Sequence, residues 1–208
     1  MMIERPDYWN QAITELAAVD AVMAQLIAQY PEISLRTRGD AFHTLARSIV
    51  GQQISVKAAD SVWNRLAAFL GEVNSRAVLA ASVEELRACG LSQRKVEYLG
   101  DLARHHHEGR LNPGDWHDWD DEDIIKELVS IRGIGRWTAE MFLIFYLARP
   151  NVLPLDDIGL IRAIALHYHQ DERKPRAELR QLAEQWQPWC SVATWYLWRS
   201  LDPVPVEY

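Results

Sequence analysis

The sequence predicts an all-α fold, on three observations. Apolar residues recur with helical spacing in most segments, capping residues and Pro or Gly breakers separate those segments, and no stretch alternates apolar and polar residues as a half-buried strand does. The segment Val152–Leu155 is short and interrupted by Pro154, so we interpret it as an extended linker. The 208 residues, 49% of them hydrophobic, suffice for one large domain or two small ones with a substantial core.

The helices expected in the N-terminal half each combine an apolar stripe with an end signal. Ser82 and Glu85 have the spacing of a capping box, in which each side chain accepts the backbone N–H of the other residue, and Gly90 is suited to end that helix. The tripeptide Asn112–Pro113–Gly114 indicates a turn after the last of them. The expected helices are 13–30 (ended by Pro31), 42–50, 62–69 (ended near Gly71), 82–88 and 92–107.

Five further helices are expected after that turn, again from apolar spacing. Pro175 is suited to the first position of one of them, where its missing N–H costs no hydrogen bond. These helices are expected at about 121–130, 136–148, 157–169, 176–186 and 190–200.

The formal net charge of −7 is unevenly distributed along the chain. Between Asp115 and Glu127 lie seven acidic residues and Lys126, which together contribute −6, whereas Ile33–Ala59 carries four basic residues and Asp40, a balance of +3. Phosphate binding depends on Lys and Arg, so an acidic chain with a local basic strip is compatible with a nucleic-acid partner without indicating one.

The cysteines and the apolar runs indicate the compartment. Cys89 and Cys190 form neither a CxxC pair nor a disulfide framework, which suits a reduced cytosol and excludes an iron–sulfur cluster held by four cysteines of this chain. No signal peptide and no apolar run near the ~20 residues of a membrane span are visible. We expect a cytoplasmic, nucleoid-associated protein, or a nuclear one in a eukaryote, with no membrane partner.

The segment Leu128–Glu140 is the most informative part of the chain. Gly133 and Gly135, one residue apart between an acidic and an apolar helix, predict a turn that needs positive φ angles and close approach. Helix resumes near Arg136, so the backbone amides there lie at a helix N-terminus, where partial positive charge suits a phosphate. Arg136 can add a charge-assisted contact, and such a device grips DNA without recognising its sequence.

A bare Gly-x-Gly can equally be a tight link between two helices. Here the pattern continues through the apolar Ile131 and Ile134 to Thr138–Ala139, with Arg132 in place of a proline. We therefore interpret the segment as a DNA-binding helix–hairpin–helix.

This extended pattern resembles the helix–hairpin–helix (HhH-GPD) superfamily of DNA base-excision glycosylases, and above all its 3-methyladenine DNA glycosylase II branch. The resemblance covers about residues 35–200. Some members carry an additional N-terminal β-rich domain, whereas this chain begins with helices and is expected to be a compact form without it. Besides the hairpin, the resemblance rests on Ile49–Lys57, Leu153–Gly159, Trp186–Ser191 and Trp198.

The resemblance implies a fold of two helical lobes flanking a cleft. We expect residues 41–149 to form a central lobe that carries the hairpin, and residues 1–40 together with 150–208 to form a second lobe that carries the catalytic aspartate. One hairpin and one cleft suffice for the implied activity, so a monomer is expected, and the implied chemistry requires no cofactor.

Asp156 and Asp157 open a predicted helix, where two caps or surface acids would be the default interpretation. The resemblance places Asp157 at the catalytic position of the family and leaves Asp156 as a helix cap or structural partner. Breaking an N-glycosidic bond builds positive charge on the sugar, and a carboxylate held against C1′ stabilises that charge and orients or deprotonates the attacking water. An alkylated purine is already cationic, so no strong general acid is needed.

Aromatic residues stand at two informative positions of the resemblance. Bifunctional relatives carry a lysine two residues after the last hairpin glycine, which attacks the sugar to form a Schiff base. Trp137 occupies that position here, so a monofunctional enzyme that leaves an abasic site, without lyase activity, is expected. By alignment Trp137 and Trp198 line the base pocket, where a cationic base over an aromatic face gains about 0.5–2 kcal/mol. Core packing is expected for Trp186, Trp189 and Trp195.

The resemblance also implies contacts to DNA and to a cation. Gln53 lies where relatives insert a side chain into the gap left by an extruded base, although Gly51–Gln53 could also be a plain helix break. Backbone carbonyls of the hairpin often hold Na⁺ or K⁺ in the family. The run His105–His107 is expected to be a solvated face, because consecutive helical residues point about 100° apart. The expected cation ligands are Val129, Ile131 and Ile134, and the expected DNA contacts are Gln53, Ser55, Lys57, Gly133, Gly135, Arg136 and Thr138.

These expectations describe a monofunctional DNA glycosylase that flips alkylated bases of the 3-methyladenine type out of duplex DNA and excises them, the first step of base excision repair. One alternative is a non-catalytic helix–hairpin–helix module that binds DNA, which would need neither Asp157 nor a tryptophan-lined pocket. Another is a sister glycosylase for oxidised or mismatched bases, against which the missing lysine and the missing cysteine cluster argue.

Overall fold

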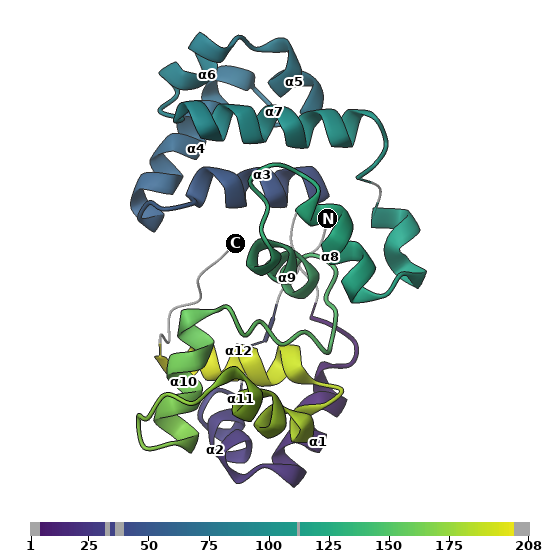
Figure 1. Cartoon of the computed structure of the whole chain (residues 1–208), viewed down its shortest axis with the longest axis vertical. Helices are drawn as coiled ribbons and strands as arrows, with labels where there is room; N and C mark the ends of the chain where they lie inside the picture. The colour runs from purple at the N-terminus through teal and green to yellow at the C-terminus, as the bar shows by residue number, and fades with distance from the viewer. Residues whose placement is uncertain (1–4, 32–33, 36–39, 112, 202–208) are drawn as a thin grey trace. The chain divides into compact units, whose positions relative to one another are not determined.

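The computed structural model describes residues 5–31, 34–35, 40–111 and 113–201 (Figure 1). These residues form helices and connecting loops, with no strand in the ranges described, which confirms the predicted all-α class. The chain divides into two compact units. The terminal unit comprises the described residues of 1–38 and 143–207, and the central unit comprises those of 39–142.

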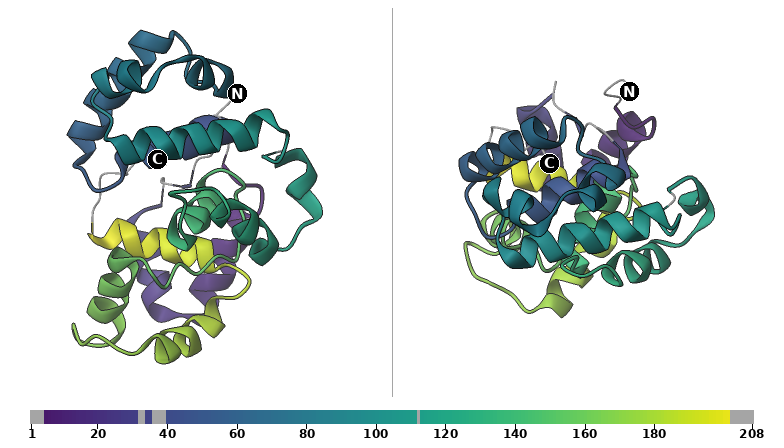
Figure 2. Two further views of the ribbon diagram at one scale, coloured as in Figure 1. Left: turned by 45° about the horizontal axis from the view of Figure 1, so that its top comes forward. Right: turned by 90° about the horizontal axis from the view of Figure 1, so that it is seen from above.

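The central unit is built around one long helix, Gln93–His107. Its elements in chain order are α3 (Ala41–Gly51), α4 (Val56–Leu70), α5 (Ser75–Ala80), α6 (Val83–Ala88), α7 (Gln93–His107), the 3-10 helix η1 (Pro113–Asp118), α8 (Asp121–Val129) and most of α9 (Arg136–Phe145). Helix α7 packs against α3, α5 and α6 (Figures 1 and 2). Val96, Leu99 and Leu102 form its buried stripe, and burial of each such side chain is worth roughly 1.5–3 kcal/mol.

The terminal unit is built around its last helix, Cys190–Leu201. Its remaining elements are α1 (Trp9–Val19), α2 (Ala21–Gln29), α10 (Ile158–Tyr168), α11 (Arg176–Ala183) and the 3-10 helix η2 (Glu184–Trp186), followed by that helix, α12. Helix α12, yellow in Figures 1 and 2, packs against α1, α2 and α10. Trp186, Trp189 and Trp195 are buried, which confirms their predicted place in the core.

The single helix expected over 13–30 is wrong, because the chain forms α1 and α2 with a break at Asp20. Asp20 is extended (φ −137°, ψ 114°), and its Oδ1 caps α2 by accepting two N–H groups of the first turn, at 2.8 and 3.2 Å. Its Oδ2 accepts the hydroxyl of Tyr168 at 2.7 Å and the indole N–H of Trp186 at 2.8 Å. These donors lie far away in the sequence, so the apolar spacing could not show the break.

The other predicted helices are present, with differences at their ends. The capping box of Ser82 and Glu85 is confirmed. Helix α5 was not expected, α9 ends at Phe145 rather than near residue 148, and Pro175 is the N-cap of α11 rather than its first residue. The predicted segment 176–186 is divided between α11 and η2.

The turn predicted at 112–114 is described only in part. Asn112 lies outside the described residues, and Pro113 begins η1. No helix among the residues that the structure describes is long and apolar enough to cross a membrane.

Candidate functional site

Asp157, in the terminal unit, is half-buried and is the N-cap of α10. Its Oδ1 accepts the N–H of Leu160 at 2.6 Å and the indole N–H of Trp198 at 2.8 Å. Two predicted site residues, 41 positions apart in the sequence, are therefore brought together. Two donors on one oxygen fix the direction of the carboxylate, and the helix N-terminus favours a negative charge at this point.

Two neighbours of this pair were missed by the sequence analysis. The ring of Phe145 stacks on Trp198, with centroids 5.8 Å apart and planes 12° apart. A Cβ on Gly159 would lie 3.1 Å from Oδ1 of Asp157 and 3.5 Å from Cδ1 of Trp198, so the carboxylate and the indole close over this glycine. A poor helix former in the first turn was a usable signal for Gly159. We find no sequence signal for Phe145.

The assignment of Asp156 as a helix cap is wrong. The N-cap side chain accepts the N–H of the third helical residue, and Leu160 stands three residues after Asp157, so Asp157 itself caps α10. Asp156 is exposed and forms an ion pair with Arg176 at the start of α11. Its role as a structural partner, the other half of the expectation, agrees with this contact.

The two hairpin glycines, in the central unit, differ from one another. Gly133 has φ +87°, and a Cβ there would lie 2.2 Å from Cδ2 of Tyr98 on α7, so both the backbone and the ring require glycine. Gly135 is exposed, its φ is not positive, and a Cβ there would meet no atom within 4 Å. The expected positive φ is confirmed at Gly133 and wrong at Gly135, because the left-handed residue alone closes the turn. Open space at Gly135 allows a ligand to approach the backbone closely.

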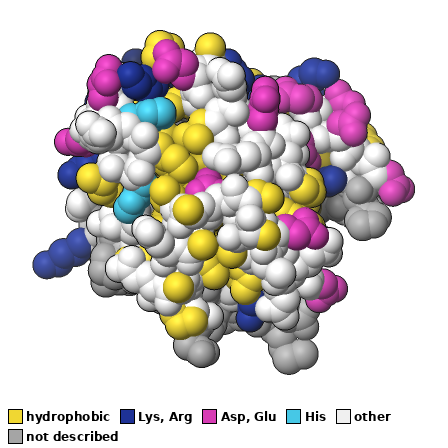
Figure 3. Space-filling model, turned by 90° about the horizontal axis from the view of Figure 1, so that it is seen from below, with side chains coloured by type: hydrophobic (Ala, Val, Ile, Leu, Met, Phe, Trp, Pro, Cys, Tyr) yellow, Lys and Arg dark blue, Asp and Glu magenta, His cyan; other side chains and the backbone are white. Residues whose placement is uncertain are grey.

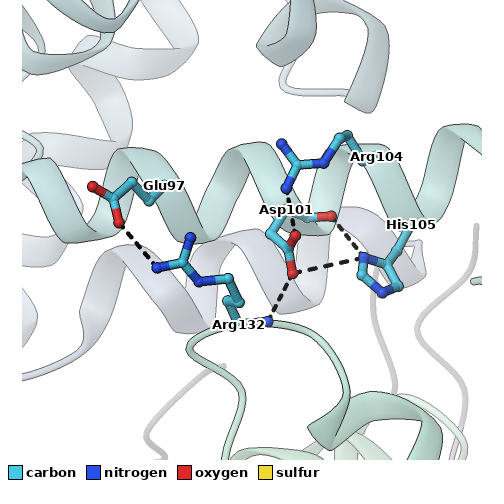
Figure 4. A network of polar contacts seen from close by, with 5 residues as sticks. All are labelled: Glu97, Asp101, Arg104, His105 and Arg132. Carbon is cyan, nitrogen blue, oxygen red and sulfur yellow. Dashed lines mark hydrogen bonds and ion pairs between the residues drawn. The ribbon is translucent and has the colours of Figure 1, made fainter.

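Two side chains outside the hairpin hold its backbone. Oδ2 of Asp101, on α7, accepts the N–H of Arg132 at 2.8 Å (Figure 4). Nε2 of Gln52, directly after α3, donates to the carbonyl of Gly133 at 2.8 Å. Burial raises the pKa of Asp101, but the hydrogen bonds from Arg132 and from the guanidinium of Arg104 outweigh it, so the pKa lies below its usual value.

Arg136, the first residue of α9, is held by two carboxylates. Both oxygens of Glu122 pair with its Nη atoms, at 3.0 Å for Nη1, and Oε1 of Glu140 accepts its Nε–H at 2.9 Å. These hydrogen bonds, with that of Glu122 the strongest, raise the pKa of Arg136. Glu122 belongs to the acidic segment 115–127, which therefore supplies an ion-pair partner to a predicted DNA-contacting residue.

Three further predicted DNA contacts lie in the loop after α3 and at the start of α4, and all three are exposed. Gln53 has φ +59°, Ser55 caps α4, and Lys57 lies in the first turn of α4. Ile54 and Val56 flank Ser55 and are 40% and 66% exposed, although both are apolar. Neither residue was among the predicted DNA contacts. Their signal is an apolar side chain beside a predicted helix break.

The remaining predicted residues lie in the hairpin and in α9. Trp137 is half-buried and Thr138 is buried, at 7% exposure. The carbonyl of Ile131 accepts the N–H of Ile134 at 3.1 Å, and Val129 is exposed. Within the described ranges, no three side chains of His, Cys, Asp or Glu gather in a way that could hold a metal ion.

Basic side chains do not gather into one patch on the face drawn in Figure 3, where acidic side chains are widely spread. Within the predicted basic strip 33–59, Arg36 and Arg38 lie outside the described residues. Arg47 pairs with Asp60 at 2.5 Å, and Lys57 is exposed.

Comparison with known families decides the classification. Residues 46–188 match the family model of the HhH-GPD superfamily of base excision DNA repair proteins. The chain belongs to this superfamily. The matched segment contains the loop after α3, the hairpin and Asp157, and the resemblance inferred from the sequence is thereby confirmed.

Individual members of the superfamily agree with this assignment. A Bacillus subtilis protein named as a candidate DNA-3-methyladenine glycosylase is 34% identical over 169 residues, covering 77% of this chain and 59% of the relative, so the chain spans less than two thirds of that relative. The crystal structure of a DNA-3-methyladenine glycosidase from Bacillus halodurans superposes with a TM-score of 0.86 at 33% identity, covering 97% of this chain and 93% of the other. The Schizosaccharomyces pombe 3-methyladenine DNA glycosylase, solved in complex with abasic DNA, gives 0.77 at 26% identity, covering 95% and 98%.

Proposed function

We propose that this HhH-GPD protein is a monofunctional DNA glycosylase that excises alkylated bases of the 3-methyladenine type from duplex DNA, as the first step of base excision repair. The observation that carries the proposal is the carboxylate of Asp157, fixed at a helix N-terminus by Leu160 and Trp198. The names of the Bacillus halodurans and Schizosaccharomyces pombe proteins support this substrate class. The abasic DNA bound to the Schizosaccharomyces pombe enzyme is the product that such a reaction leaves.

Duplex DNA is gripped at the hairpin. Backbone N–H groups at the start of α9 bind a phosphate, and the exposed Gly135 lets the phosphodiester come close. Such a contact fixes the position of the duplex without recognising its sequence. This suits an enzyme that must find a damaged base in any context.

The target base then leaves the stack. Extrusion costs a few kcal/mol, and a side chain inserted into the gap offsets part of that cost. Gln53 occupies the exposed loop expected to supply this wedge, with the exposed Ile54 beside it. The ring of Trp198 offers its face to the extruded base, and a cationic base over such a face gains about 0.5–2 kcal/mol.

Asp157 acts in the bond-breaking step. The bond between C1′ and the purine nitrogen breaks, and its electron pair leaves with the base, which neutralises the positive charge of an alkylated purine. The carboxylate stabilises the positive charge that develops on the sugar. Water then bonds to C1′, and its proton passes to the carboxylate or to solvent. An abasic site and a free base result.

No lyase step is expected, because Trp137 stands where bifunctional relatives carry the attacking lysine. Borohydride added during the reaction traps a Schiff base in a bifunctional enzyme. We expect no trapped protein–DNA adduct here and no strand nicking, and an adduct would contradict the monofunctional assignment.

The proposal is tested with alkylated duplex DNA and the Asp157→Asn variant. Asn also caps helices well, so this change removes the negative charge with little effect on α10. We expect wild type to release 3-methyladenine and the variant to be slower by roughly 10²–10⁴-fold, with an unchanged thermal midpoint. Equal release by both would contradict the role of Asp157. Tight DNA binding without release by wild type would instead identify a binding module.

Three further features belong to the proposal. The carbonyls of Val129, Ile131 and Ile134 hold a structural Na⁺ or K⁺ at the hairpin; the carbonyl of Ile131 also accepts the N–H of Ile134. DNA affinity should then be lower in a buffer whose only monovalent cation is a large organic one than in a K⁺ buffer of equal ionic strength.

The protein acts as a monomer, which sedimentation at a series of protein concentrations would check. It works where DNA is, in the nucleoid or nucleus, without a membrane partner.

A further inference from the structure

Helix α7 supports the hairpin and the end of α3 from one face. Lys95, Tyr98 and Asp101 are spaced three residues apart, so they follow one side of the helix. Nζ of Lys95 donates to the carbonyl of Val50 at 2.7 Å, in the last turn of α3. The ring of Tyr98 lies where a Cβ of Gly133 would be.

Two further hydrogen bonds hold two successive hairpin residues. The N–H of Arg132 donates to Asp101, and the carbonyl of Gly133 accepts from Gln52, each at 2.8 Å. Gly133 is the residue with positive φ, so these two bonds clamp the peptide groups on either side of the turn. The direction of the N–H groups at the start of α9 depends on this turn.

The surroundings of Asp101 favour a charged carboxylate that accepts the N–H of Arg132. Asp101 is 7% exposed, and its second oxygen accepts Nη2 of Arg104 at 2.5 Å, while Nδ1 of His105 lies 3.7 Å from the oxygen that binds Arg132 (Figure 4). A hydrogen bond from a backbone N–H to a carboxylate is shorter and stronger than one to a neutral acceptor. The bonds that lower the pKa of Asp101 keep it charged and accepting at neutral pH.

Gln52 adds a link between two DNA-contacting segments. It directly precedes Gln53 in the exposed loop, and its side chain reaches the hairpin, 81 positions away in the sequence. The position of the hairpin and the position of the loop are therefore coupled through this hydrogen bond. The two segments that the proposed function places on DNA share one hydrogen-bonded connection.

We propose that Asp101 and Gln52 are positioning residues for DNA binding, which clamp Arg132 and Gly133 so that the hairpin and the loop 52–55 meet the duplex already arranged. Neither side chain touches the reacting atoms. Without the clamp, only a fraction of molecules presents the binding conformation, and the apparent affinity falls by that fraction. This inference rests on the proposed function.

The experiment compares Asp101→Ala, Asp101→Asn and Gln52→Ala with wild type. Asn keeps an oxygen that can accept the N–H of Arg132, so it is the conservative rescue. Asp20→Asn is the matched control, because Asp20 is also a buried carboxylate that accepts backbone N–H groups, but lies in the terminal unit. All measurements are made at a temperature below the thermal midpoint of every variant. They are the dissociation constant for a duplex with a stable abasic analogue, the single-turnover rate at saturating alkylated DNA, and the rate of amide hydrogen exchange at Arg132 and Gly133.

We expect Asp101→Ala and Gln52→Ala to weaken binding about tenfold, with faster exchange at the hairpin amides. The single-turnover rate at saturation should stay within about twofold of wild type, because DNA binding selects the arranged conformation. Asp101→Asn should recover most of the affinity. Asp20→Asn should lower the thermal midpoint and leave the affinity unchanged.

Unchanged affinity in both alanine variants would overturn the inference, as would an equal loss in Asp20→Asn. A fall in the saturated rate as large as the fall in affinity would also overturn it, since the residues would then act on chemistry. If Asp101→Ala does not fold, Gln52→Ala alone decides. Base release by wild type tests the proposed function separately: a protein that binds the abasic duplex without releasing bases still reports on the clamp.

Discussion

The indole N–H of Trp198 donates to the carboxylate of Asp157 at 2.8 Å, while the same ring stacks on Phe145. One side chain from α12 thus orients the carboxylate and presents an aromatic surface beside it. Only the second of these roles was expected from the sequence. Because the bond and the stacking use different parts of the ring, substitution can separate them.

Trp198→Phe keeps an aromatic ring for the base and for Phe145 but removes the N–H donor. A lost hydrogen bond to a charged group is worth about 1.5–3 kcal/mol, so we expect the single-turnover rate to fall roughly ten- to hundredfold. The affinity for DNA should change little. Trp189→Phe is the control, since it removes an indole that donates to Glu15 at 2.6 Å, away from Asp157. Equal loss of rate in both variants would show that Trp198 acts only through stability.

Gly159→Ala tests how closely this pair is packed. A Cβ would lie 3.1 Å from Oδ1 of Asp157, so the carboxylate must shift by a few tenths of an ångström. Alanine is also the better helix former, by about 1 kcal/mol. We therefore expect unchanged or raised thermal stability together with a rate at least about fivefold lower, because small misplacement of a reacting group is costly. Wild-type activity in this variant would show that the carboxylate tolerates the shift.

The sequence could predict what local patterns encode. The turn at Gly133 and the capping box of Ser82 and Glu85 follow from spacing and capping rules, whereas the catalytic position of Asp157 was expected from the family resemblance. The partners of these residues could not be predicted, because they come from distant elements: Trp198 reaches Asp157 from α12, and Asp101 reaches the hairpin from α7. The apolar spacing also predicted a continuous helix across Asp20. The chain breaks there because donors from distant residues bind the carboxylate of Asp20.

The ion pair of Glu122 and Arg136 leads to a prediction about DNA affinity. A phosphate near Arg136 must compete with a carboxylate that already binds two of its nitrogens. Glu122→Gln should therefore tighten binding of undamaged duplex, about three- to tenfold at low salt, and steepen the salt dependence by about one phosphate contact.

Asp123→Asn is the matched control for that variant. It also removes one negative charge, at the neighbouring residue, but the side chain of Asp123 pairs with Lys126, at 2.8 Å, and not with Arg136. Titrations of fluorescent duplex at several salt concentrations give both quantities. If both variants bind the duplex more tightly by the same factor, the change in net charge alone explains the gain in affinity. Weaker binding by Glu122→Gln would show that the ion pair holds Arg136 in a DNA-binding position.

The two hairpin glycines should respond in opposite ways to alanine. Gly133→Ala places a Cβ against Tyr98 at a residue with φ +87°, which we expect to cost roughly 2–4 kcal/mol of stability through strain and overlap. Gly135→Ala meets no atom within 4 Å and needs no unusual φ, so its stability should stay within about 1 kcal/mol of wild type.

Binding should separate the two variants further. The methyl group of Gly135→Ala stands where the proposed phosphodiester approaches, and we expect a dissociation constant about tenfold higher in a fully folded protein. Chemical denaturation and duplex titration of both variants check this pair of outcomes. Wild-type affinity in Gly135→Ala would move the phosphate contact away from this residue. Wild-type stability in Gly133→Ala would mean that Tyr98 moves aside at little cost, and that the hairpin is less tightly held on α7 than the clamp by Asp101 and Gln52 requires.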